Sequence, residues 1–112
     1  MEFDSNRPIW LQIYDSICEK ILSGEFMPEG RIPSVREFGA DIGVNPNTVA
    51  RSYEKLTDAG IIYTKRGLGY FVSSDAVETV KAEERKNFME EELPRLLKRM
   101  YLLGIDPKEV LK

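Results

Sequence analysis

Side chains suited to nucleic-acid binding lie close together near the middle of the sequence. Asn47, Thr48 and Arg51 fall within five residues, and Arg36 precedes them. The guanidinium fork of arginine matches the paired acceptors of a guanine edge or a phosphate, asparagine pairs with an adenine edge, and threonine binds phosphate. These residue types predict DNA binding, provided that one surface presents them together.

Residues for catalytic or metal chemistry are scarce. The sequence has no histidine and one cysteine, Cys18, so it provides no disulfide framework, no histidine-containing metal cluster and no imidazole base. The consecutive acids Glu90, Glu91 and Glu92 point around a helix and do not converge on one ion. We therefore expect no enzyme activity, no metal and no cofactor.

The charge balance argues both ways. A formal net charge of −3 and a pI of about 5.1 differ from the strongly basic balance of a general nucleic-acid binder. Between Arg31 and Tyr70, however, six basic residues outnumber four acidic ones. A local basic face is compatible with this distribution.

The 112 residues, 42% of them apolar, suffice for one modest core and a small appendage. Met1 is followed by Glu2, Phe3 and Asp4 rather than by a signal peptide, and no apolar run approaches the roughly 20 residues of a membrane span. We expect a cytoplasmic protein that does not bind a membrane. Residues 1–7 are expected to be frayed.

A first helix is predicted from Pro8 to about Leu22, because apolar residues repeat every four positions. Pro8 suits the first turn, and Gly24 suits the C-terminal stop. Trp10 and Cys18 are interpreted as core residues rather than ligands. The apolar stripe consists of Ile9, Trp10, Ile13, Tyr14, Ile17, Ile21 and Leu22.

Two short helices joined by a tight turn should follow the loop 25–32. Ser34 and Glu37 have the spacing of a capping box, and the apolar residues after them place one buried face on a helix that ends near Ile42. Arg36 falls on the other side. Three interpretations stay open for it: a DNA contact, a solvated side chain, or an ion pair with Glu37 or Asp41.

The second of these helices should begin sharply after the turn at 43–45. Asn45 is a good N-cap and Pro46 a good first helical residue, and we expect the helix to continue to Gly60. The apolar spacing predicts that Val49, Tyr53 and Leu56 face the core. The opposite face then presents Asn47, Arg51, Lys55 and Asp58, the composition of a recognition helix or of any solvated helix face.

A β-hairpin is predicted after Gly60. The segments 61–64 and 70–72 are β-branched and aromatic, and a basic, glycine-containing break separates them. The tip of this hairpin should carry Lys65 and Arg66, where they can touch phosphates or enter a minor groove.

In their order along the chain, these motifs resemble the winged-helix domain of GntR-type bacterial transcription regulators. The matching segments are 8–13 (PIWLQI), 21–24 (ILSG), 32–37 (IPSVRE), 43–49 (GVNPNTV), 60–62 (GII) and 66–72 (RGLGYFV). They cover about two thirds of the chain. The resemblance implies a mostly α fold with a small β-hairpin, a winged helix-turn-helix, in a dimeric repressor that binds an inverted repeat of double-stranded DNA.

By the same resemblance, the DNA surface includes Arg36, Asn47, Thr48, Arg51, Gly67 and Gly69. Many members carry arginine at the positions of Pro46 and Ala50, so their base-by-base recognition rules do not transfer to this chain. The Asn-Pro-Asn-Thr-Val version with a short tail is similar to the YtrA branch. The full candidate set for DNA binding is Arg36, Asn45, Asn47, Thr48, Arg51, Lys55, Lys65, Arg66, Gly67 and Gly69.

The tail, residues 75–112, should be a helical dimerisation extension of the winged domain 1–74. Its second half carries an apolar stripe without an evident partner in the chain, and pairing with a second copy or folding back onto the winged domain would each bury it. Pro94 should kink or break the helix near Glu91–Leu93, so one kinked helix and two helical pieces both stay open. The stripe residues are Met89, Leu93, Leu96, Leu97, Met100 and Leu103.

The sequence therefore predicts a homodimeric, sequence-specific transcription regulator. The alternative is a winged-helix protein-interaction module without specific DNA binding, which the acidic pI favours and which leaves the grouping of Arg36, Asn47, Arg51 and Arg66 unexplained. A small-molecule effector at the dimer interface stays open.

Overall fold

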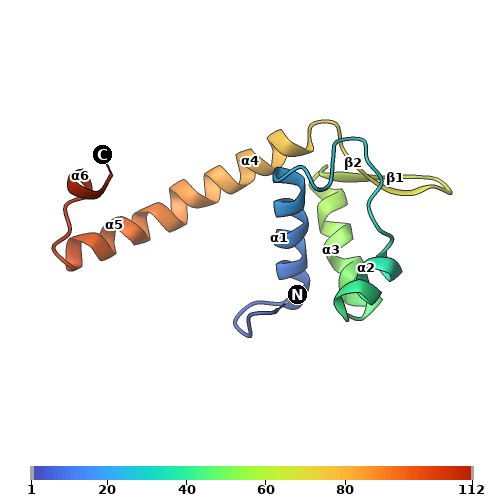
Figure 1. Cartoon of the computed structure of the whole chain (residues 1–112), viewed down its shortest axis with the longest axis horizontal. Coiled ribbons are helices and arrows are strands. Elements are labelled where there is room, and N and C mark those ends of the chain that lie inside the picture. The colour runs from blue at the N-terminus through green and yellow to red at the C-terminus, as the bar shows by residue number, and fades with distance from the viewer. Residues whose placement is uncertain (1, 112) are drawn as a thin grey trace. The chain divides into compact units, whose positions relative to one another are not determined.

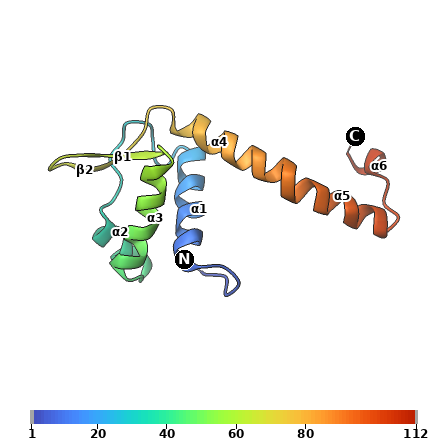
Figure 2. The same cartoon turned by 180° about the vertical axis from the view of Figure 1, so that it is seen from behind.

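A computed structural model describes residues 2–111 and contains two compact units, Met1–Val80 and Lys81–Lys112. The first unit carries a helix-turn-helix followed by a two-stranded antiparallel wing, as the sequence predicts (Figures 1 and 2). Its elements are α1 (Ile9–Leu22), α2 (Val35–Ile42), α3 (Pro46–Asp58), β1 (Ile62–Lys65), β2 (Gly69–Val72) and the start of α4 (Ala76–Asn87). The fold is mostly helical, as expected.

Helix α1 begins after Pro8 and ends at Leu22, as predicted. Ile13, Ile17 and Ile21 are fully buried, and Cys18 is buried beside them. The two ends of the apolar stripe are less buried than predicted, because Ile9 and Leu22 are 43% and 38% exposed. The helix is longer than the surface it covers, so the apolar repeat alone does not show where the contact stops.

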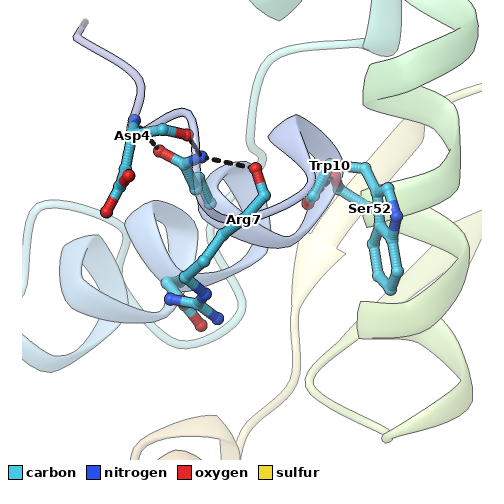
Figure 3. A network of polar contacts seen from close by, with 6 residues as sticks. Asp4, Arg7, Trp10 and Ser52 are labelled. Carbon is cyan, nitrogen blue, oxygen red and sulfur yellow. Dashed lines mark hydrogen bonds and ion pairs between the residues drawn. The ribbon is translucent and has the colours of Figure 1, made fainter.

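The segment that precedes α1 is tied to the helix, so the expectation of a frayed lead-in was wrong for residues 4–7. The side chain of Gln12 accepts a hydrogen bond from the Asp4 amide at 2.7 Å, and its amide group donates to the carbonyl oxygens of Asp4 and Arg7 at 2.6 and 2.9 Å (Figure 3). An ion pair of 2.6 Å joins Arg7 to Asp15. One polar side chain thus satisfies backbone groups across a turn.

The capping box that starts α2 is confirmed. The Ser34 hydroxyl accepts a hydrogen bond from the Glu37 amide, and the Glu37 carboxylate accepts one from the Ser34 amide, both at 3.1 Å. Hydrogen bonding by the Ser34 backbone amide and side chain to the Glu37 carboxyl holds its pKa below the ordinary value, and Arg31 lowers it further. Gly43 ends the helix in the left-handed conformation that glycine adopts without strain.

The tight turn between α2 and α3 needs a glycine inside α2. A Cβ atom at Gly39 would lie 2.7 Å from the carbonyl oxygen of Val44 and 3.6 Å from the Val49 side chain. Helix α3 can approach α2 this closely only because position 39 has no side chain.

Helix α3 begins as predicted, with Asn45 as N-cap and Pro46 in the first turn. It ends at Asp58 rather than Gly60, and Gly60 turns the chain with a φ of +75°. As expected, Val49, Tyr53 and Leu56 are fully buried. Both α1 and α2 pack against this helix, so α3 is the centre of the first unit (Figure 1).

Tyr53 links α3 to its neighbours. Its ring packs edge-on against Phe38 of α2 and Tyr70 of β2, with centroids 6.2 and 4.9 Å apart. Its hydroxyl donates a 2.7 Å hydrogen bond to the carbonyl oxygen of Pro33, and burial raises the pKa of this phenol. Tyr53 therefore fixes the wing and both helices of the helix-turn-helix to one core.

The wing consists of β1 and β2, paired from Ile62 with Val72 to Lys65 with Gly69. A single bridge between Arg31 and Phe71 connects the loop before α2 to β2. The Tyr63 hydroxyl donates a 2.6 Å hydrogen bond to the Glu29 carboxylate, which raises the pKa of Tyr63. The wing is thus anchored along its length to the loop that leads into α2.

The helical backbone is continuous from Ala76 through Leu102, so of the two effects predicted for Pro94, a kink or a break, the break does not occur. Proline lacks an N–H group, and its ring crowds the carbonyl of residue i−4. A π-helical segment, η1 (Phe88–Glu92), lies at this point and widens the helix ahead of the proline, which occupies the first turn of α5 (Leu93–Leu102). The chain ends with α6 (Pro107–Val110), capped by Asp106.

The division between the two compact units lies after Val80, within α4, whereas the sequence suggested a domain boundary after Ser74. Ala76 and Val80 are buried in the core of the first unit. The first five residues of α4 therefore complete the core of the winged domain.

Candidate nucleic-acid interface

Helix α3 presents a polar face on the side opposite its buried residues. Asn47, Arg51 and Lys55 are exposed, and Thr48 is half-buried next to the core residue Val49. The spacing of four residues places these exposed side chains in one row along the helix. Because the opposite side is anchored in the core, α3 offers this row as a fixed surface.

Asn45 caps α3, and this limits how its side chain can contact DNA. Its side-chain oxygen accepts a 2.8 Å hydrogen bond from the amide of Asn47 and caps α3. The oxygen is thereby occupied, whereas its NH₂ group is a donor that the capping bond does not use.

Arg36 is exposed on α2 and makes no hydrogen bond or ion pair within residues 2–111. The interpretation that it pairs with Glu37 was wrong, because the Glu37 carboxylate faces a different guanidinium. Arg31 lies 3.6 Å from Glu37. The guanidinium of Arg36 is therefore available to a ligand.

The wing places only part of its predicted basic tip in the turn. Lys65 is the last residue of β1, paired with Gly69, and its ammonium lies 4.4 Å from the centre of the Phe71 ring. Arg66 and Gly67 occupy the three-residue turn, where both are exposed. Gly67 and Gly69 have φ angles of +77° and +104°, which side-chain-bearing residues rarely adopt.

Arg31 is a residue of this surface that the sequence did not single out. Its Nε donates a 3.1 Å hydrogen bond to the carbonyl oxygen of Leu68 at the wing tip, while its terminal nitrogen faces Glu37 of α2. A Cβ at Gly69 would lie 3.3 Å from the Arg31 Nε. The sequence showed the charge of Arg31 but not this contact, which spans 37 positions.

Trp10 was interpreted as a core residue, and the structure places it elsewhere. Its half-buried ring lies under two cations of α3, with the Arg51 guanidinium carbon 4.4 Å and the Lys55 ammonium 5.4 Å from the ring centre. The Lys55 ammonium also lies 5.2 Å from the centre of the Tyr14 ring. Helix α1 therefore contributes aromatic surface next to the exposed row of α3.

The described residues provide neither a metal site nor a membrane-spanning helix. Residues 2–111 contain no group of three or more histidine, cysteine or acidic side chains arranged to hold a metal ion. Cys18 is buried. Among the same residues, no helix is long and apolar enough to cross a membrane.

The model of the gntR family of bacterial regulatory proteins matches residues 10–72, the segment that contains α1, the helix-turn-helix and the wing. The chain belongs to this family. It is a GntR-family helix-turn-helix transcription regulator that binds DNA, and not an enzyme.

Small regulators resemble this GntR regulator over most of their length. It is 36% identical over 111 residues to an uncharacterized helix-turn-helix transcriptional regulator of Bacillus subtilis, YhcF, covering 99% of this chain and 90% of that protein. It is also 36% identical over 102 residues to the transcriptional repressor YtrA of the same organism, covering 91% of this chain and 78% of YtrA.

Solved structures share the fold of the GntR regulator, and one of them is a complex with DNA. A GntR-family regulator from Listeria monocytogenes superimposes with a TM-score of 0.82, at 32% identity, over 97% of this chain and 94% of the other. The DNA-binding domain of AraR in complex with operator ORR3 matches with a TM-score of 0.58, at 29% identity, over 65% of this chain and 86% of that domain.

Proposed function

We propose that this regulator is a homodimeric repressor that recognises an inverted-repeat operator through α3. The observation that carries this proposal is the row of Asn47, Arg51 and Lys55, exposed on a helix whose other side is fully buried. A helix held in this way fits a major groove, where asparagine and arginine discriminate bases and lysine binds phosphate. Specificity and affinity would then come from different side chains of one helix.

The candidate residues outside α3 would position the helix. Arg36, exposed and without a partner in the described chain, suits a phosphate or a guanine edge. Arg66 and Gly67 at the wing tip would approach the neighbouring backbone or minor groove, where glycine allows close contact. Thr48, Asn45 and Lys65 are weaker candidates. Thr48 is half-buried, the side-chain oxygen of Asn45 caps α3, and Lys65 lies in β1 rather than in the turn of the wing.

Dimerisation is proposed through the tail, residues 75–112, with residues 1–74 as the DNA-binding domain. Four residues of the stripe are between 40% and 63% exposed: Met89, Leu96, Leu97 and Leu103. A second copy of the chain would bury this apolar surface. Leu93 is half-buried and Met100 is 8% exposed in the single chain, so these two have less surface left to bury. Folding back of the stripe onto the winged domain stays the alternative.

The direction of regulation and the cellular setting are inferred by analogy. Repression is proposed because the similar B. subtilis YtrA is a repressor. A cytoplasmic location follows from a DNA target inside the cell. For a small-molecule effector at the dimer interface, the tail offers a groove of about 510 Å³, lined by Leu97, Tyr101, Gly104, Ile105, Asp106 and Pro107.

Selection of bound duplexes from a random DNA pool tests this function. We expect a palindrome whose half-sites lie about 34 Å apart, one helical turn, or a multiple of it. Binding of the enriched duplex should weaken steeply between two salt concentrations, because phosphate contacts release counterions. If no sequence is enriched, the acidic protein-interaction module becomes the better explanation.

A further inference from the structure

Trp10 is half-buried at the start of α1. It belongs neither to the buried core of the described chain nor to the partly buried apolar residues packed against that core. It lies in the first turn of α1, directly beside α3 (Figure 3). Its position therefore has to be explained by what it contacts on α3.

The contact holds two consecutive turns of α3. The Ser52 hydroxyl, fully buried, donates a short hydrogen bond to the Trp10 carbonyl oxygen and fixes the backbone of Trp10 to α3. The indole ring then lies under Arg51, whose guanidinium carbon is 4.4 Å from its centre, with the Lys55 ammonium at 5.4 Å. Backbone and side chain of one residue are thus both engaged by the recognition helix.

A ring under a guanidinium restrains a side chain that is otherwise free to sample many rotamers. The aromatic face attracts the cation, while the N–H donors at the edge of the guanidinium stay able to bind a base or a phosphate. Arg51 is the exposed arginine in the α3 row, so its orientation decides which base position it reaches.

We propose that Trp10 is a positioning residue for DNA specificity, which holds the guanidinium of Arg51 in the orientation that reads the operator. This inference rests on the proposed function, since Arg51 must contact bases for its orientation to matter. Trp10 itself does not bind DNA in this scheme, and it acts through Arg51.

The contact is measurable without DNA, because Trp10 is the single tryptophan of the sequence. Arg51→Gln removes the guanidinium from one face of the ring and should shift the fluorescence emission of the free protein to longer wavelength. Arg36→Gln is the matched control, since it removes an exposed arginine of α2. An unchanged spectrum for Arg51→Gln, or an equal shift for Arg36→Gln, would overturn the contact.

The role in specificity is tested by comparing the selected operator with a duplex that carries one substituted base pair per half-site. Trp10→Leu should reduce the ratio of the two affinities by roughly 2- to 5-fold, the range expected for a cation–π contact at an exposed site. Trp10→Phe, which keeps an aromatic face, should retain most of the ratio. The double variant Trp10→Leu with Arg51→Gln should discriminate no worse than Arg51→Gln alone.

The outcomes separate the two proposals. If the wild-type protein enriches no operator, the proposed function fails. If it discriminates and Trp10→Leu folds but discriminates equally well, Trp10 has a packing role only and the inference fails. Should Trp10→Leu not fold, Trp10→Phe and Arg51→Lys decide: full discrimination by Arg51→Lys would show that the stacked guanidinium is not needed.

Discussion

Arg31 and Leu68 are joined by a 3.1 Å hydrogen bond between the arginine Nε and the leucine carbonyl oxygen, across 37 positions of sequence. The same guanidinium faces Glu37 at 3.6 Å, in the first turn of α2. The wing tip and the helix-turn-helix are therefore connected by one side chain. Since both would contact the same DNA, this connection sets the distance between two parts of the proposed interface.

Arg31→Ala should weaken operator binding by about 1 kcal/mol, because loss of one exposed hydrogen bond frees the wing tip. The midpoint of thermal unfolding should change little, since Arg31 is exposed and leaves no buried group unpaired. Titration of the selected duplex measures the binding. Arg7→Ala, which removes only the surface ion pair with Asp15, serves as control. Equal affinities for both variants would contradict a role of the wing connection.

Arg36→Ala and Arg51→Ala should each weaken binding of the specific duplex by about 1–3 kcal/mol while the protein stays folded. Neither arginine is buried, so circular dichroism and thermal unfolding should match the wild type. Lys20→Ala, which removes a cation paired with Glu25 at 2.7 Å, is the charge-matched control. Unchanged affinity for both arginine variants would remove them from the interface.

Gly39→Ala should lower the free energy of unfolding by about 1–3 kcal/mol, as overpacking in a tight contact does. The added Cβ would lie 2.7 Å from the Val44 carbonyl oxygen, a backbone atom that cannot rotate away. Denaturant titration measures the change. At a solvent-exposed helix position, glycine to alanine would stabilise the helix. A gain in stability would therefore show that the turn between α2 and α3 can move to make room for the Cβ.

Glu37→Gln should make the protein less stable at neutral pH but not at acid pH. The hydrogen bonds from Ser34 hold the pKa of Glu37 below its ordinary value of 4.5. A lowered pKa means that the carboxylate stabilises the fold above pH 4.5, and that this contribution disappears as the pH falls through the folded-state pKa. Unfolding curves of both proteins across this range should converge towards low pH. A constant difference would contradict the assignment.

Leu96→Glu combined with Leu103→Glu should convert the protein to a monomer that is still folded. These side chains are 50% and 63% exposed in the single chain, so a charge there costs little until a second copy covers it. Sedimentation equilibrium gives the oligomeric state. Leu102→Glu, next to the stripe but about 100° around the helix, is the control. A dimer that survives the double change would exclude the stripe as interface.

Local signals in the sequence determined most of the elements. Ser34 with Glu37, and Asn45 with Pro46, start their helices where capping chemistry predicts, because caps depend on residues only two or three positions apart. The buried residues of α3 were also predictable, since a helical repeat of apolar residues can be satisfied only on one side. The order of these motifs was sufficient to indicate the family.

Contacts between distant segments were decided by the tertiary structure. Trp10 looked like a core residue, yet it lies under Arg51, because the end of the apolar stripe on α1 extends beyond the core. Arg31, not Arg36, faces Glu37, because the loop before α2 pairs with the wing. Pro94 widens the helix without breaking it, because a π-helical segment accommodates the missing bond. The spacing of residues along the chain predicts the helix or strand to which a residue belongs. The contacts of Trp10 and Arg31 and the shape of the helix at Pro94 depend instead on which parts of the structure pack beside them.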